Sequence, residues 1–330
     1  MINFKAKLVD DAELINILML TRGRPEKVVH AIRSLDKLAG NKDKIELWVY
    51  VDDDDIRTLD FIASEWDKSI GIQINWHVSS RPITHGAAFT ELWNISSNAG
   101  IYMVFCDDYV VNTDNWDIFV RETFFNIPSD RIAVGYLSDP LMPKGGINFM
   151  VETAEWINQV GHFVVPYFPY WFGDTWLQQI AEMVDRKYAI PVNVWPMDGE
   201  KGKTHRLWDL PFWDHFFNAL LAERVETAIG IIDRLTSDNT VAREYAIANM
   251  YEKIEEFEEA AKAGQSRKEL ESTQLILSQE TKSKDETYLT ALRQGERHLK
   301  TMMPKIQEMK IQQMLWNKQK IFTNKFPHKI

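Results

Sequence analysis

Two apolar runs in the first third of the chain each end in a cluster of aspartates. Residues 45–51 (IELWVYV) lead into Asp52–Asp55, and residues 101–106 (IYMVFC) lead into Asp107 and Asp108. Each run reads as a buried β-strand, and a helical pattern follows it before the next strand begins. This order predicts an α/β fold with an open, mostly parallel sheet, whose ligands bind outside the carboxyl ends of the strands. We therefore expect both clusters to lie on one edge of the sheet.

Carboxylates that are brought together repel one another unless a cation or a bound partner offsets their charge. A divalent metal ion with a phosphate-bearing ligand is therefore the leading hypothesis for this edge. The alternative is that part of the acidic run is solvated loop charge, which is the reading we adopt for Asp54 and Asp55.

The spacing of apolar residues extends the sheet in both directions. Residues 14–20 form a first strand, and a helix starts at Pro25 and continues to about residue 38, which closes a β-α-β unit with the strand at 45–51. Residues 70–78 alternate strictly between apolar and polar side chains, as at the edge of a sheet. Residues 131–137 and 188–195 predict further strands.

Everything beyond Pro211 reads as helix. An apolar stripe with helical spacing covers residues 247–261, and a second covers residues 289–309, where Pro304 is expected to kink the helix. Because 330 residues exceed the usual size of a single core, we predict a main domain at 1–210 and a helical appendage at 211–330. The stripes need cover, so the appendage is expected to pack on the main domain or to form a homo-oligomer contact.

The charge and the cysteine content limit the classes of protein to which this chain can belong. The net charge is −10, but the stretch from Arg297 to Ile330 carries about +7, which leaves about −17 on the body. An acidic body argues against a broad nucleic-acid groove, whereas the basic tail suits an anionic surface. The single Cys106 excludes an internal disulfide framework, and the sequence shows neither a signal-peptide core nor an apolar run of about 18 residues. We expect a cytoplasmic protein.

Several motifs together resemble the GT-A glycosyltransferases, and most closely their small, family-two-like phage and bacterial members. The motifs are LTRGRP at residues 20–25, Asp52-Asp53, YMVFCDD at residues 102–108 followed by Trp116-Asp117, and FGDTWL at residues 172–177. The resemblance covers residues 14–210. It implies a Rossmann-like mixed sheet flanked by helices, a nucleotide-sugar donor and transfer to an acceptor hydroxyl.

The resemblance implies a donor site around the first two strands. An aspartate after the second strand contacts the base, which points to Asp52 or Asp53, and the turn after the first strand packs the nucleotide through Thr21, Arg22 and Arg24. An arginine fork suits a diphosphate, and Arg81, after the third strand, is a further candidate for the same task. The alternative is that these arginines are ordinary surface residues.

Asp107 and Asp108 match the DxD metal motif of the family imperfectly. Neighbouring residues of a strand point to opposite faces, so we expect one carboxylate to reach the metal, with Asp108 as the ligand and Asp107 as a ribose or supporting contact. Mn²⁺ or Mg²⁺ is then expected to bridge the donor diphosphate. A late histidine often lies near the metal in this family, which makes His205 a second ligand candidate, against the alternative of an exposed loop histidine.

The resemblance places Asp174 in the catalytic-base region. An inverting transfer needs a carboxylate that takes the proton of the acceptor hydroxyl, and the aromatic neighbours of Asp174 are expected to raise its pKa. The alternative role is a helix N-cap, which the sequence Gly173-Asp174-Thr175 also suits. The two roles are compatible.

The function predicted from the sequence is that of a metal-assisted glycosyltransferase with a favoured UDP-sugar donor. Two alternatives stay open: a GT-A-like protein that binds a nucleotide sugar or glycan without turnover, and a nucleotidylyltransferase, for which the turn at residues 21–24 is a poor match. The acceptor is not identified. Modified DNA is a less favoured acceptor, because the body of the protein is acidic.

Overall fold

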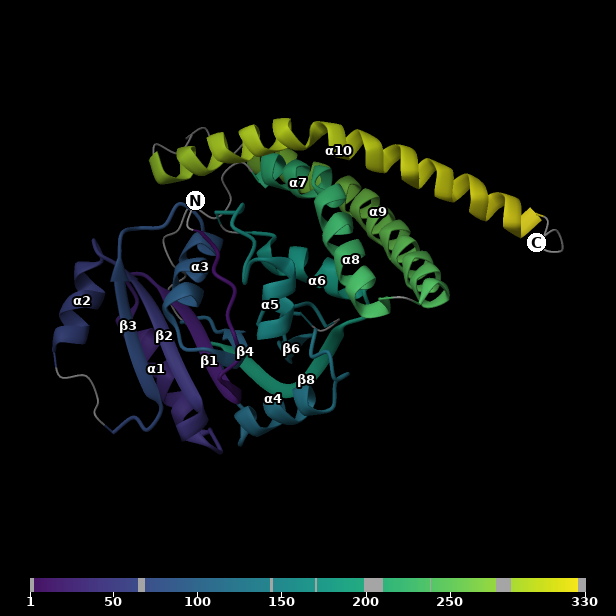
Figure 1. Ribbon diagram of the computed structural model, residues 1–330. Coiled ribbons are helices and arrows are strands. Elements are labelled where there is room, and N and C mark those ends of the chain that lie inside the picture. Colours follow the sequence, from purple (N-terminus) through teal and green to yellow (C-terminus); the bar gives the residue numbers. More distant parts are fainter. Residues whose placement is uncertain are drawn as a thin grey trace. The chain divides into compact units, whose positions relative to one another are not determined.

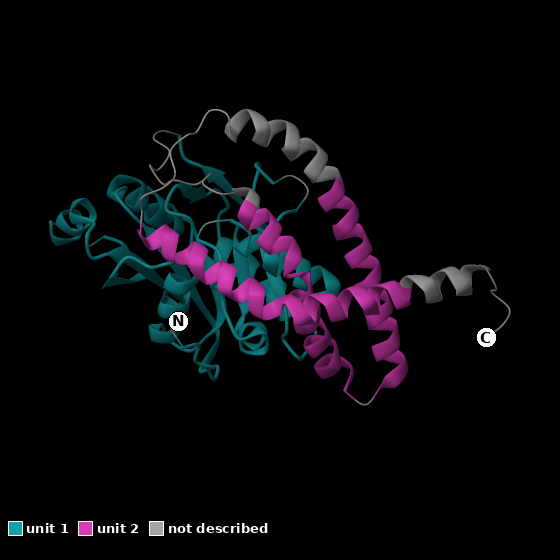
Figure 2. Cartoon of the chain, turned by 90° about the horizontal axis from the view of Figure 1, so that it is seen from above, with its two compact units in different colours: residues 1–206 teal, residues 207–330 magenta. Residues whose placement is uncertain are grey.

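The computed structural model describes residues 3–64, 69–142, 145–169, 171–198, 210–237, 239–276 and 286–325. The chain divides into two compact units, residues 1–206 and residues 207–330, which Figure 2 draws in different colours. The division lies four residues before the boundary predicted from the sequence.

The first unit contains an eight-stranded mixed sheet with the order β3-β2-β1-β4-β7-β6-β8-β5. Strands β3, β2, β1 and β4 are parallel, β7 is antiparallel to both of its neighbours, and β8 is parallel to β6 but antiparallel to β5. The strands are β1 (Asp11–Thr21), β2 (Ile45–Asp52), β3 (Gln73–Ser79), β4 (Ala99–Val104), β5 (Tyr109–Val111), β6 (Val134–Ser138), β7 (Met150–Thr153) and β8 (Lys187–Pro196).

Helices flank the sheet on both faces (Figure 1). Those of the first unit are α1 (Pro25–Lys37), α2 (Ile56–Ala63), α3 (His85–Ile95), α4 (Trp116–Phe125), α5 (Ala154–Val160) and α6 (Gly173–Met183), with a short 3₁₀ turn at Lys42–Lys44. The second unit, described by itself, consists of the helices α7 (Leu210–Ala219), α8 (Leu221–Thr236), α9 (Thr240–Ile276) and α10 (Glu286–Lys325).

The central strands are buried on both faces, as the continuous apolar runs predict. On β1, Ile17 and Met19 point into the core beneath α1 and α4, while Leu18 points to the opposite face, and all three are fully buried. On the opposite face, Trp93 of α3 packs against Tyr102 of β4 with ring centroids 4.4 Å apart. The predicted mostly parallel α/β sheet is therefore confirmed, including the edge position of the alternating third strand.

Two strands were not predicted from the sequence. Strand β5 has three residues and β7 has four, which is too short for alternation to be recognised. In addition, β4 ends at Val104, so that Asp107 and Asp108 lie in a turn between β4 and β5 instead of on a continuing strand. This difference changes how the two carboxylates are oriented, as described below.

Glu152, in the middle of β7, is a carboxylic acid in an apolar interior. Its side chain is fully buried, and neither carboxyl oxygen has a hydrogen-bond partner among the residues that the structure describes. Burial raises the pKa of this carboxyl well above its usual value. Because a buried polar group without a partner costs stability, Glu152→Met is expected to raise the free energy of unfolding by about 1–3 kcal/mol.

The same substitution should change the pH dependence of stability. Since the native state holds the Glu152 proton more tightly than the unfolded chain, the wild-type free energy of unfolding should fall as pH rises above the ordinary glutamate pKa. Urea unfolding at pH 5 and pH 8 measures this slope, which Glu152→Met should flatten. Glu122→Met, at an exposed position of α4, is the matched control and should change stability by less than about 0.5 kcal/mol. A destabilised Glu152→Met variant would contradict the prediction.

The second unit consists of helices whose apolar stripes face inward. Met250 and Ile254 of α9 and Met302 and Ile306 of α10 are buried, and α8 packs against both helices. Pro304 lies inside helix α10, and the kink expected there stays a prediction. The predicted homo-oligomer contact of this unit stays a prediction. Among the described residues, no helix combines the length and hydrophobicity that crossing a membrane requires.

Candidate functional site

The candidate site lies at the carboxyl edge of the parallel strands, where the strand order reverses. Strand β1 has β2 on one side and β4 on the other, and both are parallel to it. The turns that follow β1 and β4 therefore leave the sheet side by side, at the topological switch point where open α/β sheets bind their ligands. The acidic clusters after β2 and β4 share this edge, as the sequence predicted.

The turn after β1 is held in place by a carboxylate that the sequence analysis read as solvated. Asp55 is buried, accepts a hydrogen bond from the Gly23 backbone N–H at 2.6 Å, and caps α2 by accepting from the Thr58 N–H at 3.3 Å. Gly23 has φ +68°, a left-handed conformation that favours glycine. The solvated reading of Asp55 is therefore wrong: this carboxylate fixes the loop that carries Arg22 and Arg24.

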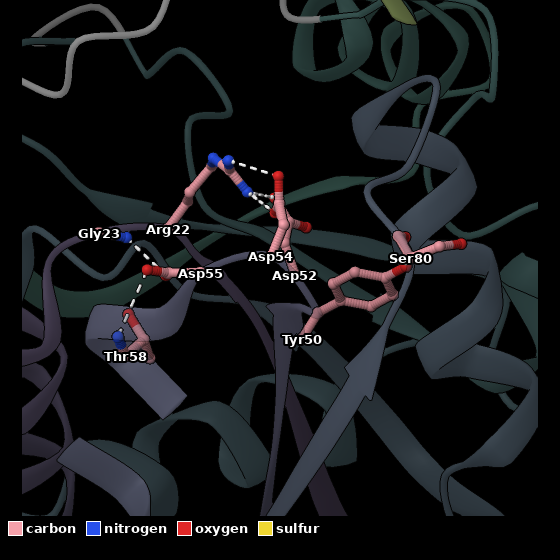
Figure 3. Close-up of polar contacts among 8 residues, drawn as sticks. All are labelled: Arg22, Gly23, Tyr50, Asp52, Asp54, Asp55, Thr58 and Ser80. Atoms are coloured by element: carbon pink, nitrogen blue, oxygen red, sulfur yellow. Dashed lines mark hydrogen bonds and ion pairs between the residues drawn. The ribbon is translucent and has the colours of Figure 1, made fainter. Parts of the chain in front are cut away.

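Arg22 bridges two aspartates of the first cluster (Figure 3). One guanidinium nitrogen donates to Asp52 at 2.6 Å and also contacts Asp54, while the second nitrogen donates to the other Asp54 oxygen at 3.0 Å. Asp52 is buried, and burial raises its pKa against the opposing effect of Arg22, whereas the contact with Arg22 lowers the pKa of the exposed Asp54. The positive charge of Arg81 acts on both carboxylates. Asp54 is thus a salt-bridge partner, and the solvated reading of its charge is incomplete.

Arg24 bridges the second cluster in the same way. Its Nη2 donates to Asp107 Oδ1 at 2.5 Å and its Nη1 donates to Asp108 Oδ2 at 3.0 Å. The second oxygen of Asp107 accepts from the Thr21 hydroxyl at 2.8 Å, which ties the turn after β1 to the turn after β4. The expectation that the two neighbouring carboxylates point to opposite faces is wrong, because the strand has ended and both converge on one cation.

Burial changes the protonation of this second cluster. Loss of hydration raises the pKa of Asp107 to about 6, although Arg24 and Thr21 stabilise the ionised form. The carboxylate is therefore mostly ionised at pH 7. Burial, followed by the charges of Asp108 and Asp107, raises the pKa of the neighbouring Cys106 thiol. Because the thiolate is the reactive species, a thiol held in its protonated form serves as a packing group.

The donor set of Asp107 and Asp108 fits a divalent cation in part. Their oxygens converge on a single positive group, the Arg24 guanidinium, and hard oxygen ligands are those that Mg²⁺ and Mn²⁺ prefer. Over the described ranges, no group of three or more His, Cys, Asp and Glu side chains is placed to hold a metal ion. A metal ion here would therefore need further oxygens from a bound ligand.

Asp174 lies in the first turn of α6, one residue after its start. The N-cap is Phe172, with φ +74°, so the alternative that Asp174 is the cap is wrong. Asp174 Oδ1 accepts from the Thr175 N–H at 2.7 Å and the Thr175 hydroxyl at 3.3 Å, and burial raises the pKa of the carboxyl. Because α6 reaches β8 through a three-residue turn and packs against it, its first turn points toward the carboxyl edge.

Asp139, a buried carboxylate that directly follows β6, was not predicted as a site residue from the sequence. It accepts from the Asn148 amide at 2.6 Å and the Leu141 N–H at 2.8 Å. Burial, followed by the charge of Asp139, raises the pKa of Tyr109. Strand β6 is antiparallel to β7, which is antiparallel to β4, so Asp139 lies on the same edge as Asp107. The available signal was an aspartate at a strand end, the pattern already used for Asp52 and Asp107.

Two further candidates differ in outcome. Asp53 donates its backbone N–H to the Ser79 carbonyl at 2.8 Å, and its side chain is exposed, so Asp52 is the better placed of the two base-contact candidates. His205 lies outside the described residues, and its role as a metal ligand stays a prediction.

No protein-family model matches the sequence, and no sequence among the curated proteins matches it either. Similar folds occur among solved structures. Residues 1–349 of S. aureus TarS in complex with UDP-GlcNAc share 9% identity over 73% of this chain and 81% of that chain, with a TM-score of 0.49. The mannosyltransferase PcManGT from Pyrobaculum calidifontis in complex with GDP-Man and Mn²⁺ shares 12% identity over 95% and 91%, with a TM-score of 0.46. GalNAc-T7 with UDP, GalNAc and Mn²⁺ shares 9% identity over 73% and 55%, with a TM-score of 0.48.

Proposed function

We propose that the protein is a glycosyltransferase that uses a nucleoside-diphosphate sugar, with a UDP-sugar as the favoured donor. The observation that carries this proposal is the pair of arginines on the turn at the switch point. Arg22 and Arg24 leave one short turn, and each engages two carboxylates at the carboxyl edge of the sheet. This edge is where the fold binds ligands, and arginine forks match the paired oxygens of phosphates.

The proposed donor lies across the turns that follow β1 and β4. Arg22 and Arg24 hold the diphosphate, Arg81 adds positive charge, and the buried Asp52 is available to the base or ribose. Asp107 and Asp108 are the residues that would hold Mn²⁺ or Mg²⁺, with the donor oxygens completing the coordination. The chemistry that such an ion supplies is neutralisation of the charge that develops on the leaving diphosphate.

Asp174 is the proposed general base of an inverting transfer. Its raised pKa makes the carboxylate a better proton acceptor than an exposed aspartate, and the positive end of the α6 dipole limits this effect. The acceptor is a hydroxyl compound. Contact of the basic tail with an anionic surface also stays a prediction.

UDP is expected to raise the thermal melting temperature of the full chain, whereas uridine at the same concentration should not. The reason is that the proposed site recognises the diphosphate, and a ligand that binds only the native state stabilises it by about 2.7 kcal/mol at a concentration of 100 Kd. The measurement is a thermal-shift panel of UDP, GDP, CDP, uridine and UDP-sugars with Mn²⁺. A protein that no nucleoside diphosphate stabilises would contradict the proposed function.

Product analysis separates the proposal from its two alternatives. A transferase releases UDP from a UDP-sugar, either on transfer to an acceptor or by slow hydrolysis. A binding protein is stabilised by the UDP-sugar but leaves it intact. A nucleotidylyltransferase instead releases pyrophosphate from UTP and a sugar phosphate, so chromatography of both reaction mixtures distinguishes the three functions.

A further inference from the structure

Arg24 occupies the same carboxylate oxygens that a divalent cation would need. Its two terminal nitrogens contact Asp107 Oδ1 at 2.5 Å and Asp108 Oδ2 at 3.0 Å, while the other Asp107 oxygen is held by Thr21. A metal ion between the two carboxylates would be in the place of the guanidinium. Because two positive groups at this spacing repel each other, Arg24 and a divalent cation exclude one another from the pair.

The environment makes this competition strong. The side chains of Asp107 and Arg24 are 3% and 20% exposed, so water screens their interaction only weakly. Asp108 is more open, at 26%, and faces solvent from the same turn. Release of Arg24 therefore needs another anion that can accept hydrogen bonds from its two terminal nitrogens. A diphosphate presents paired oxygens with suitable geometry for this.

We propose that Arg24 is an exchangeable counter-ion that makes metal binding depend on the donor. Without donor, Arg24 holds Asp107 and Asp108 and keeps a divalent cation out; with donor, it moves to the diphosphate and leaves both carboxylates to the cation. The donor half of this statement rests on the proposed function, whereas the competition between Arg24 and the cation does not. The two ligands should consequently bind as a pair.

The first test measures Mn²⁺ binding to the full chain without any nucleotide. Electron paramagnetic resonance reports free Mn²⁺, and wild type is expected to bind it weakly. Arg24→Met removes the guanidinium while keeping a side chain of similar length, and it should tighten Mn²⁺ binding at least about tenfold. The double variant Arg24→Met/Asp108→Asn should lose the gain. Arg186→Met is the matched control, because Arg186 pairs with Asp130 ahead of β6 and β8, at the amino edge of the sheet, and its Mn²⁺ affinity should equal that of wild type.

The second test uses wild type alone, so it holds even if Arg24→Met fails to fold. UDP should tighten Mn²⁺ binding, after subtraction of the Mn²⁺–UDP complex measured without protein, and Mn²⁺ should tighten UDP binding by the same factor. Coupling between two sites typically amounts to about 5- to 150-fold. A folded Arg24→Met variant should show little of this coupling.

The outcomes separate the two proposals. Tight Mn²⁺ binding by nucleotide-free wild type, or no gain in a folded Arg24→Met variant, would overturn the exchange. Independent binding of UDP and Mn²⁺ would overturn it as well. If no nucleoside diphosphate binds at all while Arg24→Met gains Mn²⁺ affinity, the proposed function fails and the competition between Arg24 and the cation stands.

Discussion

Asp174→Asn is expected to lower the rate of sugar transfer about 10²- to 10⁴-fold and to leave donor affinity unchanged. The substitution keeps the size of the side chain and an oxygen for the Thr175 hydrogen bonds but removes the proton acceptor. Donor affinity should hold, because no contact links Asp174 to the arginines in the described part of the chain. The measurements are turnover of a UDP-sugar with an acceptor, or its slow hydrolysis, and UDP binding by calorimetry.

Glu182→Gln is the matched control for this prediction, since it changes a carboxylate at the far end of the same helix. It should leave turnover within about twofold of wild type. Retained turnover in Asp174→Asn would make Asp174 a structural residue. The base would then be Asp198, which lies two residues after β8, or the transfer would be a retaining one without a protein base. Loss of both binding and turnover would place Asp174 in the donor site or in the fold.

Asp117→Ala is expected to lower the free energy of unfolding by about 3–5 kcal/mol, a large share of the 5–15 kcal/mol that holds a typical protein folded. Asp117 is fully buried in α4 and accepts from the backbone N–H groups of Gly40 and Asn41 at 2.6 and 2.9 Å and from Arg121 at 2.6 Å. Removal of the carboxylate leaves two amide donors and a guanidinium without this partner. Urea unfolding measures the loss.

Asp114→Ala, in the exposed turn before α4, is the control and should change stability by less than about 0.5 kcal/mol. Asp117 belongs to one of the motifs that resemble glycosyltransferases, but its contacts are structural. We therefore expect the folded fraction of Asp117→Ala to bind UDP like wild type. A stable variant that has lost UDP binding would show instead that Asp117 serves the ligand site.

Hydrophobic periodicity was sufficient to predict most of the sheet. Strands β1, β2 and β4 are continuous apolar runs, β3 alternates, and each pattern has a direct physical cause in burial on two faces or on one. The strands predicted at 131–137 and 188–195 correspond to β6 and β8. The short strands β5 and β7 were not predicted, because they have no recognisable hydrophobic pattern and depend on pairing with the neighbouring strands.

The residues of the site were predictable, but their partners were not. Strand ends identified Asp52, Asp107 and the turn with Arg22 and Arg24, because position along a strand is a local property. Which arginine meets which aspartate depends on contacts across about 30 and about 84 residues of sequence, set by strand order and turn geometry. Asp55 is a second example of a contact that the sequence could not predict. Its charge can be read from the sequence, but its burial and its hydrogen bond with Gly23 depend on the fold.

The pairing of β5 with β8 has a consequence for the order of folding. The backbone carbonyl of Asp108 accepts a hydrogen bond from the Met197 N–H at 2.8 Å, and the three residues that follow Asp108 pair with Val194–Pro196. During synthesis, strands β1 and β4 and the turns after them, which carry Arg24 and Asp107, leave the ribosome well before this closing strand. We expect a nascent chain that ends before β8 to form the core of strands β1 to β4 early. The turn that carries Asp107 and Asp108 would not yet be held in place by β8. Competence to hold a cation would then arise late, after the remainder of the sheet has closed.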